Sequence, residues 1–320
     1  MKSPIFIFSL PRSGSTLLQR VLSGHTEIAT AAEPWILLPY CYANRQNGLL
    51  SEYSHSTSFR AVSEFTNGVG KAKYNKEMNK FVSSLYQNYC LNGECYFIDK
   101  TPRYYLIIKE IREIFPKAKF IFLFRNPLHV IGSVIDTFSA GGLGKVYHYR
   151  IDFTEGFNCL SKGYELIKDV SYSLRYEDFV TNPRQYVSEI CTYLELDYQS
   201  EMLDSLSGRD LTGSMGDPVI KNLARKIDVS GLHKWKKSCS GIYRKSVVRS
   251  LVEKMSPEAY ETQGYSKNDV IDDVSSLSRH FKSLVKDFIQ YNLGHLIVHF
   301  KLNILLGRSS KSWTRNKYLG

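Results

Sequence analysis

The sequence predicts an α/β fold, a parallel sheet flanked by helices on both faces. Three observations predict it: short, wholly apolar segments recur, a helical pattern follows each of them, and charged residues stand where the apolar segments end. Strands that are apolar on both sides belong to sheets covered on both faces, which is typical of parallel sheets. Ligands bind beyond the C-terminal ends of such strands, so the charged residues there are candidate site residues.

Each expected strand is followed by an expected helix. The apolar residues of each helix recur at intervals of three and four, which places them on one face. The pairs are, in chain order, 5–8 with 15–24, 96–98 with 103–115, 120–124 with 127–138, and 172–174 with 183–194.

The periodic pattern weakens between residues 35 and 94, where a helix over 76–91 is expected. We interpret 36–94 as an insertion over the site. It lies within a single α/β domain that spans residues 1–280.

Residues 281–320 are expected to form a helical, basic C-terminal extension. Apolar residues from Val285 to Ile304 recur at helical spacing, and the last twenty residues contain five basic and no acidic residues. Two interpretations are open. The apolar face packs on the chain's own core, or it contacts a second subunit or an anionic membrane surface.

Composition and charge limit the partners. Lys and Arg number 42 against 31 Asp and Glu, a net charge of +11, and 43% of the residues are hydrophobic. This excludes a disordered chain and a disulfide-stapled scaffold, and it favours anionic partners. The six cysteines have neither a CxxC pair nor zinc spacing, and no stretch reaches about 18 apolar residues. We therefore expect free thiols and a cytoplasmic location.

The first motif, PRSGSTL from Pro11 to Leu17, lies between the first expected strand and its helix. Backbone N–H groups and the helix dipole form an anion site at such a junction. Gly14 permits the tight turn, and Arg12 offers a guanidinium suited to phosphate or sulfate oxygens. The ATPase pattern is absent because no Lys precedes Ser15, so the motif is only P-loop-like. The alternative is an ordinary serine N-cap.

The second motif, FRNP at 124–127, ends the third expected strand and begins a helix. Asn126 suits the N-cap and Pro127 the first helical position. At about 100° per residue, Ser133 lies on the polar side of this helix, above Arg125. The two side chains would hold a second anion. The alternative is a surface arginine and a helix-surface serine.

Together these motifs resemble those of a sulfotransferase that uses 3′-phosphoadenosine 5′-phosphosulfate (PAPS). The order most resembles that of the tyrosylprotein sulfotransferases and related bacterial enzymes, over roughly residues 4–240. The matching segments are strand–PRSGSTLL with Glu33 downstream, DKTP at 99–102, FRNP with Ser133, RYEDF and NP within 175–183, and GDP at 216–218.

The resemblance implies a P-loop-like parallel sheet and a role for each matching residue. The loop around the 5′-phosphosulfate would be formed by Arg12, Ser13, Gly14, Ser15 and Thr16. Arg125 and Ser133 would bind the 3′-phosphate, and Tyr176 would lie near the nucleotide. Lys100 and Arg12 would both reach the transferring group. Arg12 stands at the place in the loop where the cytosolic small-molecule enzymes have a lysine. Glu33 would be the catalytic base. The GDP segment and the basic run Lys221–Lys237 resemble the loop that covers the nucleotide.

The expected function is in-line transfer of a sulfuryl group from PAPS to a hydroxyl acceptor, releasing adenosine 3′,5′-bisphosphate. A carboxylate suits the role of base, and cations stabilise charge on the leaving phosphate. No metal is expected, because no carboxylate set would hold one. The acceptor class is not readable, and nucleic acid is not an expected partner. The alternatives are a P-loop kinase or nucleotide-binding protein and a basic, non-enzymatic anion-binding protein.

Several of these residues have other interpretations. Glu33 would instead cap the helix that follows Pro34. The rival bases are His25, His129 and His148. Aromatic residues after Glu33 would line the acceptor pocket or pack in the core, namely Trp35, Tyr40, Tyr42 and Phe59.

Overall fold

The computed structural model describes residues 1–49, 51, 53–138, 141–204, 227, 229–300 and 302. The chain forms two compact units. The first comprises residues 1–125, 156–229 and 262–264, and the second comprises residues 126–155, 230–261 and 265–320. The boundary expected at residue 280 remains a prediction.

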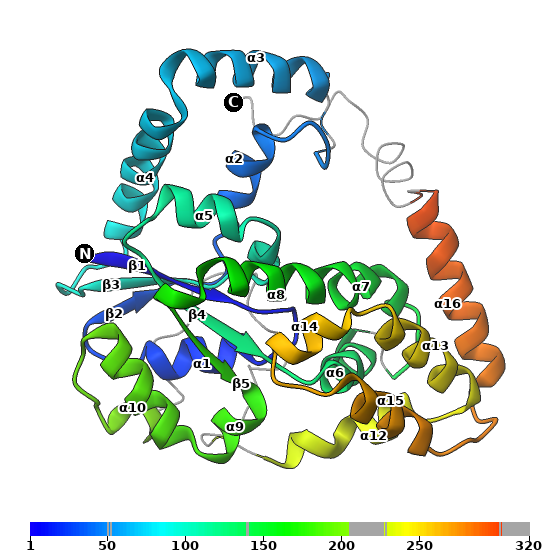
Figure 1. Ribbon diagram of the computed structural model, residues 1–320. Helices are drawn as coiled ribbons and strands as arrows, with labels where there is room; N and C mark the ends of the chain where they lie inside the picture. The colour runs from blue at the N-terminus through cyan, green and yellow to red at the C-terminus, as the bar shows by residue number, and fades with distance from the viewer. Residues whose placement is uncertain are drawn as a thin grey trace, which may run out of the picture. The chain divides into compact units, whose positions relative to one another are not determined.

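A five-stranded parallel sheet forms the centre of the first unit, in the order β2-β3-β1-β4-β5 (Figure 1). This confirms the predicted α/β class and the four expected strands. The strand β2 was not expected, because its three residues are too few for a pattern. The strands are β1 (Ser3–Phe8), β2 (Ile28–Thr30), β3 (Tyr96–Asp99), β4 (Lys119–Phe124) and β5 (Ser171–Arg175).

Aromatic side chains fill the space over the middle of the sheet. Residues 4–8 of β1 and all of β3 are buried. The ring of Phe8 lies 6.0 Å from that of Phe120 and 5.0 Å from that of Phe122, measured between centroids. Phe6 extends the cluster to Phe115 of the connection before β4, at 5.2 Å. The sheet is therefore a rigid base for the loops at its C-terminal edge.

The helices of the first unit connect and cover the strands, with α1 and α10 on one face and α5 and α8 on the other (Figure 1). The expected helix over 103–115 is two elements, because Ile107 has a non-helical φ of −134°. The elements are α1 (Ser15–Leu22), α2 (Leu37–Ala43), α3 (His55–Val69), α4 (Lys71–Gln87), η1 (Pro102–Leu106), α5 (Ile108–Ile114), α8 (Glu155–Ile167), η2 (Lys168–Val170), α9 (Tyr176–Thr181), α10 (Pro183–Leu194) and α11 (Glu201–Asp204).

The insertion over 36–94 contains α2, α3 and α4. The helix expected over 76–91 corresponds to α4, which begins at Lys71. The helix α3 was not expected, because it has few inward apolar residues and only Thr66 of it is buried. Ser54 caps α3 by accepting the N–H of Thr57 on its hydroxyl.

The second unit is helical in its described part, and none of the described helices is both long and apolar enough to cross a membrane. Its first helix, α6, carries a close contact with α12. The elements are α6 (Pro127–Phe138), α7 (Val146–Phe153), η4 (Ser230–His233), α12 (Lys234–Cys239), α13 (Ile242–Glu253), α14 (Pro257–Thr262), α15 (Lys267–Ser276) and α16 (Leu284–His299).

The contact between α6 and α12 depends on Gly132. A Cβ at this position would lie 2.7 Å from Cβ and 2.8 Å from Cα of Trp235, closer than real side chains come. His129 stacks on the same indole at 5.8 Å, and Ser238 donates a hydrogen bond to Asp136 at 2.7 Å.

We predict opposite effects for two alanine substitutions in helices. Gly132→Ala forces the α12 backbone away and is expected to lower the free energy of unfolding by roughly 1–3 kcal/mol. Gly68→Ala in α3 meets nothing within 4 Å and is expected to raise it by roughly 0.5–1 kcal/mol, because alanine favours the helix. Urea unfolding measures both. Equal effects of the two changes would contradict the packing argument.

Candidate functional site

The loop after β1 turns sharply into α1. Arg12 has a φ of 67° and Gly14 a φ of 88°, both in the left-handed region, which an arginine rarely adopts. The N–H of Ser13 donates to the carbonyl of Leu10 at 3.2 Å. The N-cap of α1 is Gly14, with no side-chain cap, so Ser15 is not an ordinary N-cap. The turn thus presents the N-terminus of α1 at the C-terminal edge of the sheet, where anions bind.

A ring and a guanidinium join this loop to the ends of two other strands. Tyr176 follows β5, and its ring fills the space above Gly14, where a Cβ would lie 2.3 Å from Cε2. The guanidinium of Arg125, which follows β4, lies 4.2 Å from the centroid of that ring. Its Nη1 donates to the carbonyl oxygen of Arg12 at 2.7 Å. The structure therefore brings these four predicted residues together.

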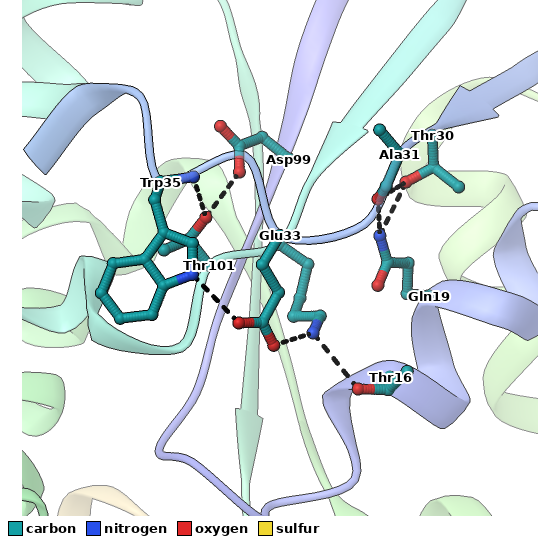
Figure 2. Close-up of polar contacts among 9 residues, drawn as sticks. Thr16, Gln19, Thr30, Ala31, Glu33, Trp35, Asp99 and Thr101 are labelled. Atoms are coloured by element: carbon teal, nitrogen blue, oxygen red, sulfur yellow. Dashed lines mark hydrogen bonds and ion pairs between the residues drawn. The ribbon is translucent and has the colours of Figure 1, made fainter. Parts of the chain in front are cut away.

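Lys100 holds a second group of predicted residues together, and Figure 2 labels two of them, Glu33 and Thr16. Lys100 directly follows β3, and its side chain is 2% exposed. Its Nζ donates to Glu33 Oε1 at 2.7 Å and to Thr16 Oγ1 of α1 at 3.2 Å. The carboxylate of Glu33 is thus fixed beside the first turn of α1, with 14% of its side chain exposed.

Trp35 orients the same carboxylate from the other side. Its indole Nε1 donates to Glu33 Oε2 at 3.1 Å, as Figure 2 shows. Its backbone has a φ of 57°, and its N–H donates to Thr101 Oγ1 at 3.2 Å. Sequence reasoning assigned Trp35 only to a pocket or the core. The helix α2 begins at Leu37 without a side-chain cap, so Glu33 does not cap it.

Asp99 is a buried carboxyl that fixes the end of β3, one residue before Lys100. It accepts hydrogen bonds from the hydroxyls of Tyr86 at 2.5 Å, Tyr104 at 3.0 Å and Thr101 at 3.1 Å. Burial raises the pKa of Asp99 to about 6, although these donors oppose the shift. Sequence reasoning missed both tyrosines, because nothing in the DKTP motif shows which distant hydroxyls will surround it.

The pKa of Asp99 gives a testable pH dependence. The carboxyl stays protonated up to a higher pH in the folded chain than in the unfolded chain. Its contribution to the free energy of unfolding is therefore fully present below the ordinary pKa of 3.8. That contribution is lost as the pH rises to about 6. Asp99→Asn does not titrate. We expect the wild-type free energy of unfolding, minus that of Asp99→Asn, to fall by about 3 kcal/mol between about pH 3 and pH 7. A difference that stays constant in urea unfolding would contradict this.

Other predicted residues lie elsewhere. Ser133 is half-buried on α6 of the second unit, whereas Arg125 belongs to the first, and a shared anion site remains a prediction. The GDP segment at 216–218 and the first part of the basic run, 221–226, lie outside the described residues.

The rival histidines differ in their surroundings. His25 is buried, and its Nδ1 accepts the N–H of Glu27 at 3.0 Å, so its Nε2 donates to the Asp197 carbonyl at 2.9 Å. Both of its ring nitrogens are thus engaged in structural bonds. His129 stacks on Trp235 in the second unit.

A cavity of about 290 Å³ lies in the first unit, between α2, α3, α4 and α5. Tyr40 lines it, as do Arg45 and Glu110, which form an ion pair. The buried Thr66 hydroxyl has no hydrogen-bond partner among the described residues. Tyr42 instead packs on the guanidinium of Arg45, at 4.7 Å.

Residues 4–200 match the Sulfotransferase family, and the chain belongs to that family. The nodulation protein NoeE of Sinorhizobium fredii is 29% identical over 137 residues, which are 41% of this chain and 31% of that protein. The protein-tyrosine sulfotransferase A of Caenorhabditis elegans is 22% identical over 253 residues, 72% of this chain and 60% of that protein. The chain thus spans from about a third to under two thirds of these relatives.

Two solved structures share the fold. The sulfotransferase domain of the Synechococcus PCC 7002 olefin synthase has a TM-score of 0.51 and 24% identity, covering 74% of this chain and 89% of that one. The sulfotransferase domain from the curacin biosynthetic pathway has a TM-score of 0.50 and 22% identity, covering 79% of this chain and 97% of that one.

Proposed function

We propose that this protein transfers a sulfuryl group from PAPS to a hydroxyl acceptor, with Glu33 as the general base. One observation carries the proposal: Lys100 joins the Glu33 carboxylate to Thr16, in the first turn of α1. A carboxylate and an ammonium group therefore lie beside the first turn of α1, which supports their proposed roles as base and cation. Membership of the sulfotransferase family supports the class of reaction.

The loop is the proposed site for the 5′-phosphosulfate of the donor, which supplies an activated sulfuryl group. Its binding residues would be Arg12, Ser13, Gly14, Ser15 and Thr16. The left-handed backbone at Arg12 and Gly14 supports this, because such turns direct successive N–H groups to one side. Ser15 and Thr16 begin α1, where N–H groups have no partner within the helix.

The proposed chemistry divides between three side chains. Glu33 takes the proton of the acceptor hydroxyl as the new oxygen–sulfur bond forms. Lys100 and Arg12 stabilise the negative charge on the departing phosphate oxygen as the old bond breaks. The indole N–H of Trp35 keeps the carboxylate oriented toward the acceptor.

Arg125 and Ser133 are the proposed contacts of the 3′-phosphate, and Tyr176 is proposed to lie near the nucleotide. The guanidinium of Arg125 is already held by the Tyr176 ring and the Arg12 carbonyl, which supports its proposed contact with the 3′-phosphate. Ser133 is supported by its place on the polar side of the helix that follows FRNP and by the resemblance of that segment.

The acceptor side is proposed to be the insertion over 36–94, which begins just after Glu33 and forms α2 to α4. Action in the cytoplasm belongs to the same proposal.

Arg125→Ala tests the donor site. Wild-type protein is expected to bind adenosine 3′,5′-bisphosphate more tightly than 5′-AMP, since loss of a charged hydrogen-bond partner costs roughly ten- to a hundredfold in affinity. The substitution is expected to remove most of that preference. Calorimetry measures both affinities, with ATP–Mg²⁺ and short DNA as the ligands of the two alternative functions. If both nucleotides weaken by the same factor, Arg125 acts only through the loop.

Glu33→Gln tests the base. It keeps the side-chain volume and removes the proton acceptor, so the transfer rate from labelled PAPS is expected to fall by ~10²–10⁴. Affinity for adenosine 3′,5′-bisphosphate is expected to stay nearly unchanged. Activity within a fewfold of wild type would show that Glu33 only positions Lys100.

A matched control removes one hydrogen bond to the same carboxylate. Trp35→Phe keeps an aromatic ring and the Glu33 carboxylate but removes the indole N–H. A single such hydrogen bond is worth up to about tenfold in rate, so this variant is expected to lose no more than about tenfold, well short of the loss expected for Glu33→Gln.

A further inference from the structure

The last described helix, α16, packs on the second unit through its polar side. Asp287 is buried and accepts hydrogen bonds from Arg244, at 2.7 Å from Nε. Gln290 accepts the N–H of Leu143 at 3.1 Å, and the ring of His295 lies 4.6 Å from that of Tyr147. The helix is therefore fixed with Asp287, Gln290 and His295 turned inward.

The apolar side of α16 faces away from those contacts. Five apolar residues form a stripe on this side, which is about 80° wide when each residue is turned by about 100° from the one before. The stripe lies roughly opposite Asp287 and Gly294, which are the buried residues of the helix. The stripe comprises Val285, Ile289, Leu293, Leu296 and Phe300, exposed by 66%, 56%, 54%, 48% and 57%. Of the two interpretations left open, packing of the apolar face on the chain's own core does not hold for these five side chains.

The surroundings of this stripe are basic. The one acidic residue of α16 is Asp287, which is neutralised by Arg244. Lys282 and Lys286 are exposed nearby. The sequence that follows Phe300 adds cations and no acid, namely Lys301, Arg308, Lys311, Arg315 and Lys317, with Trp313 among them.

We propose that the stripe of α16 is a peripheral binding surface for an anionic lipid membrane. Apolar side chains on one face of a helix, with lysines beside them and an aromatic and basic flank, suit the boundary between headgroups and acyl chains. Anionic lipids attract the cations, and the apolar side chains lose their contact with water.

A second copy of the chain fits the same stripe less well. A self-complementary contact through the stripe would bring Lys282 and Lys286 of both copies into one interface, and α16 offers them no acidic partner there. Five exposed side chains on one helix are also fewer than the 20–30 residues a side of a stable interface. A lipid surface satisfies both the charge and the shape.

The test uses the full chain and co-sedimentation with vesicles. Wild-type protein is expected to bind vesicles of phosphatidylcholine with phosphatidylserine at low salt, less at high salt, and little to phosphatidylcholine alone. The double substitution Ile289→Ser with Leu293→Ser is expected to weaken binding at least about tenfold. Its control is Leu91→Ser with Leu166→Ser, two exposed leucines of the first unit, which is expected to bind as wild type.

Three results would overturn the proposal. They are failure of the wild type to bind anionic vesicles, equal binding by the stripe variant, and equal weakening by the control variant. Because the changed residues are exposed, both variants are expected to fold, and thermal unfolding checks this. If gel filtration shows a wild-type dimer that the stripe variant loses, without vesicle binding, the occupant is a second copy. None of these results depends on sulfuryl transfer.

Discussion

The site depends on two opposite charges placed next to each other at the end of β3. Asp99 and Lys100 are both buried, and a buried charge is costly unless other groups pair with it. Each of the two residues pairs its charge with a different set of groups. Asp99 collects hydroxyl groups from Tyr86 and Tyr104, whereas Lys100 turns to Glu33 and Thr16. One strand end thus supports a structural network and a chemical one.

The structural network fastens the insertion to the sheet. Tyr86 comes from α4 and Tyr104 from η1, and the Tyr104 hydroxyl also accepts the N–H of Leu37 at the start of α2. Two elements outside the sheet therefore bond one carboxyl, and a third is joined to it through the Tyr104 hydroxyl. Glu33 and Trp35 lie on the segment between β2 and α2, so their geometry is set from both of its ends.

Much of this could be predicted from the sequence because it is local. Apolar runs predict the strands, and the PRSGSTL motif predicts the turn into α1. The pairings across long separations could not be predicted. Tyr176 over Gly14 and Trp35 on Glu33 depend on ring orientation, which no spacing determines. Likewise, periodicity finds the apolar stripe of α16 but not the direction in which it faces. Only the position of partners such as Arg244 decides that.

The close fit of Tyr176 over Gly14 restricts how this chain can vary over evolutionary time. Any side chain at residue 14 would displace the ring and would also face an unfavourable φ, so a change there needs two simultaneous compensations. A smaller residue at 176 would relieve only the first and would leave the Arg125 guanidinium without its aromatic support. A side chain at residue 14 therefore finds space only after residue 176 has become smaller, and even then it keeps the cost of the left-handed backbone.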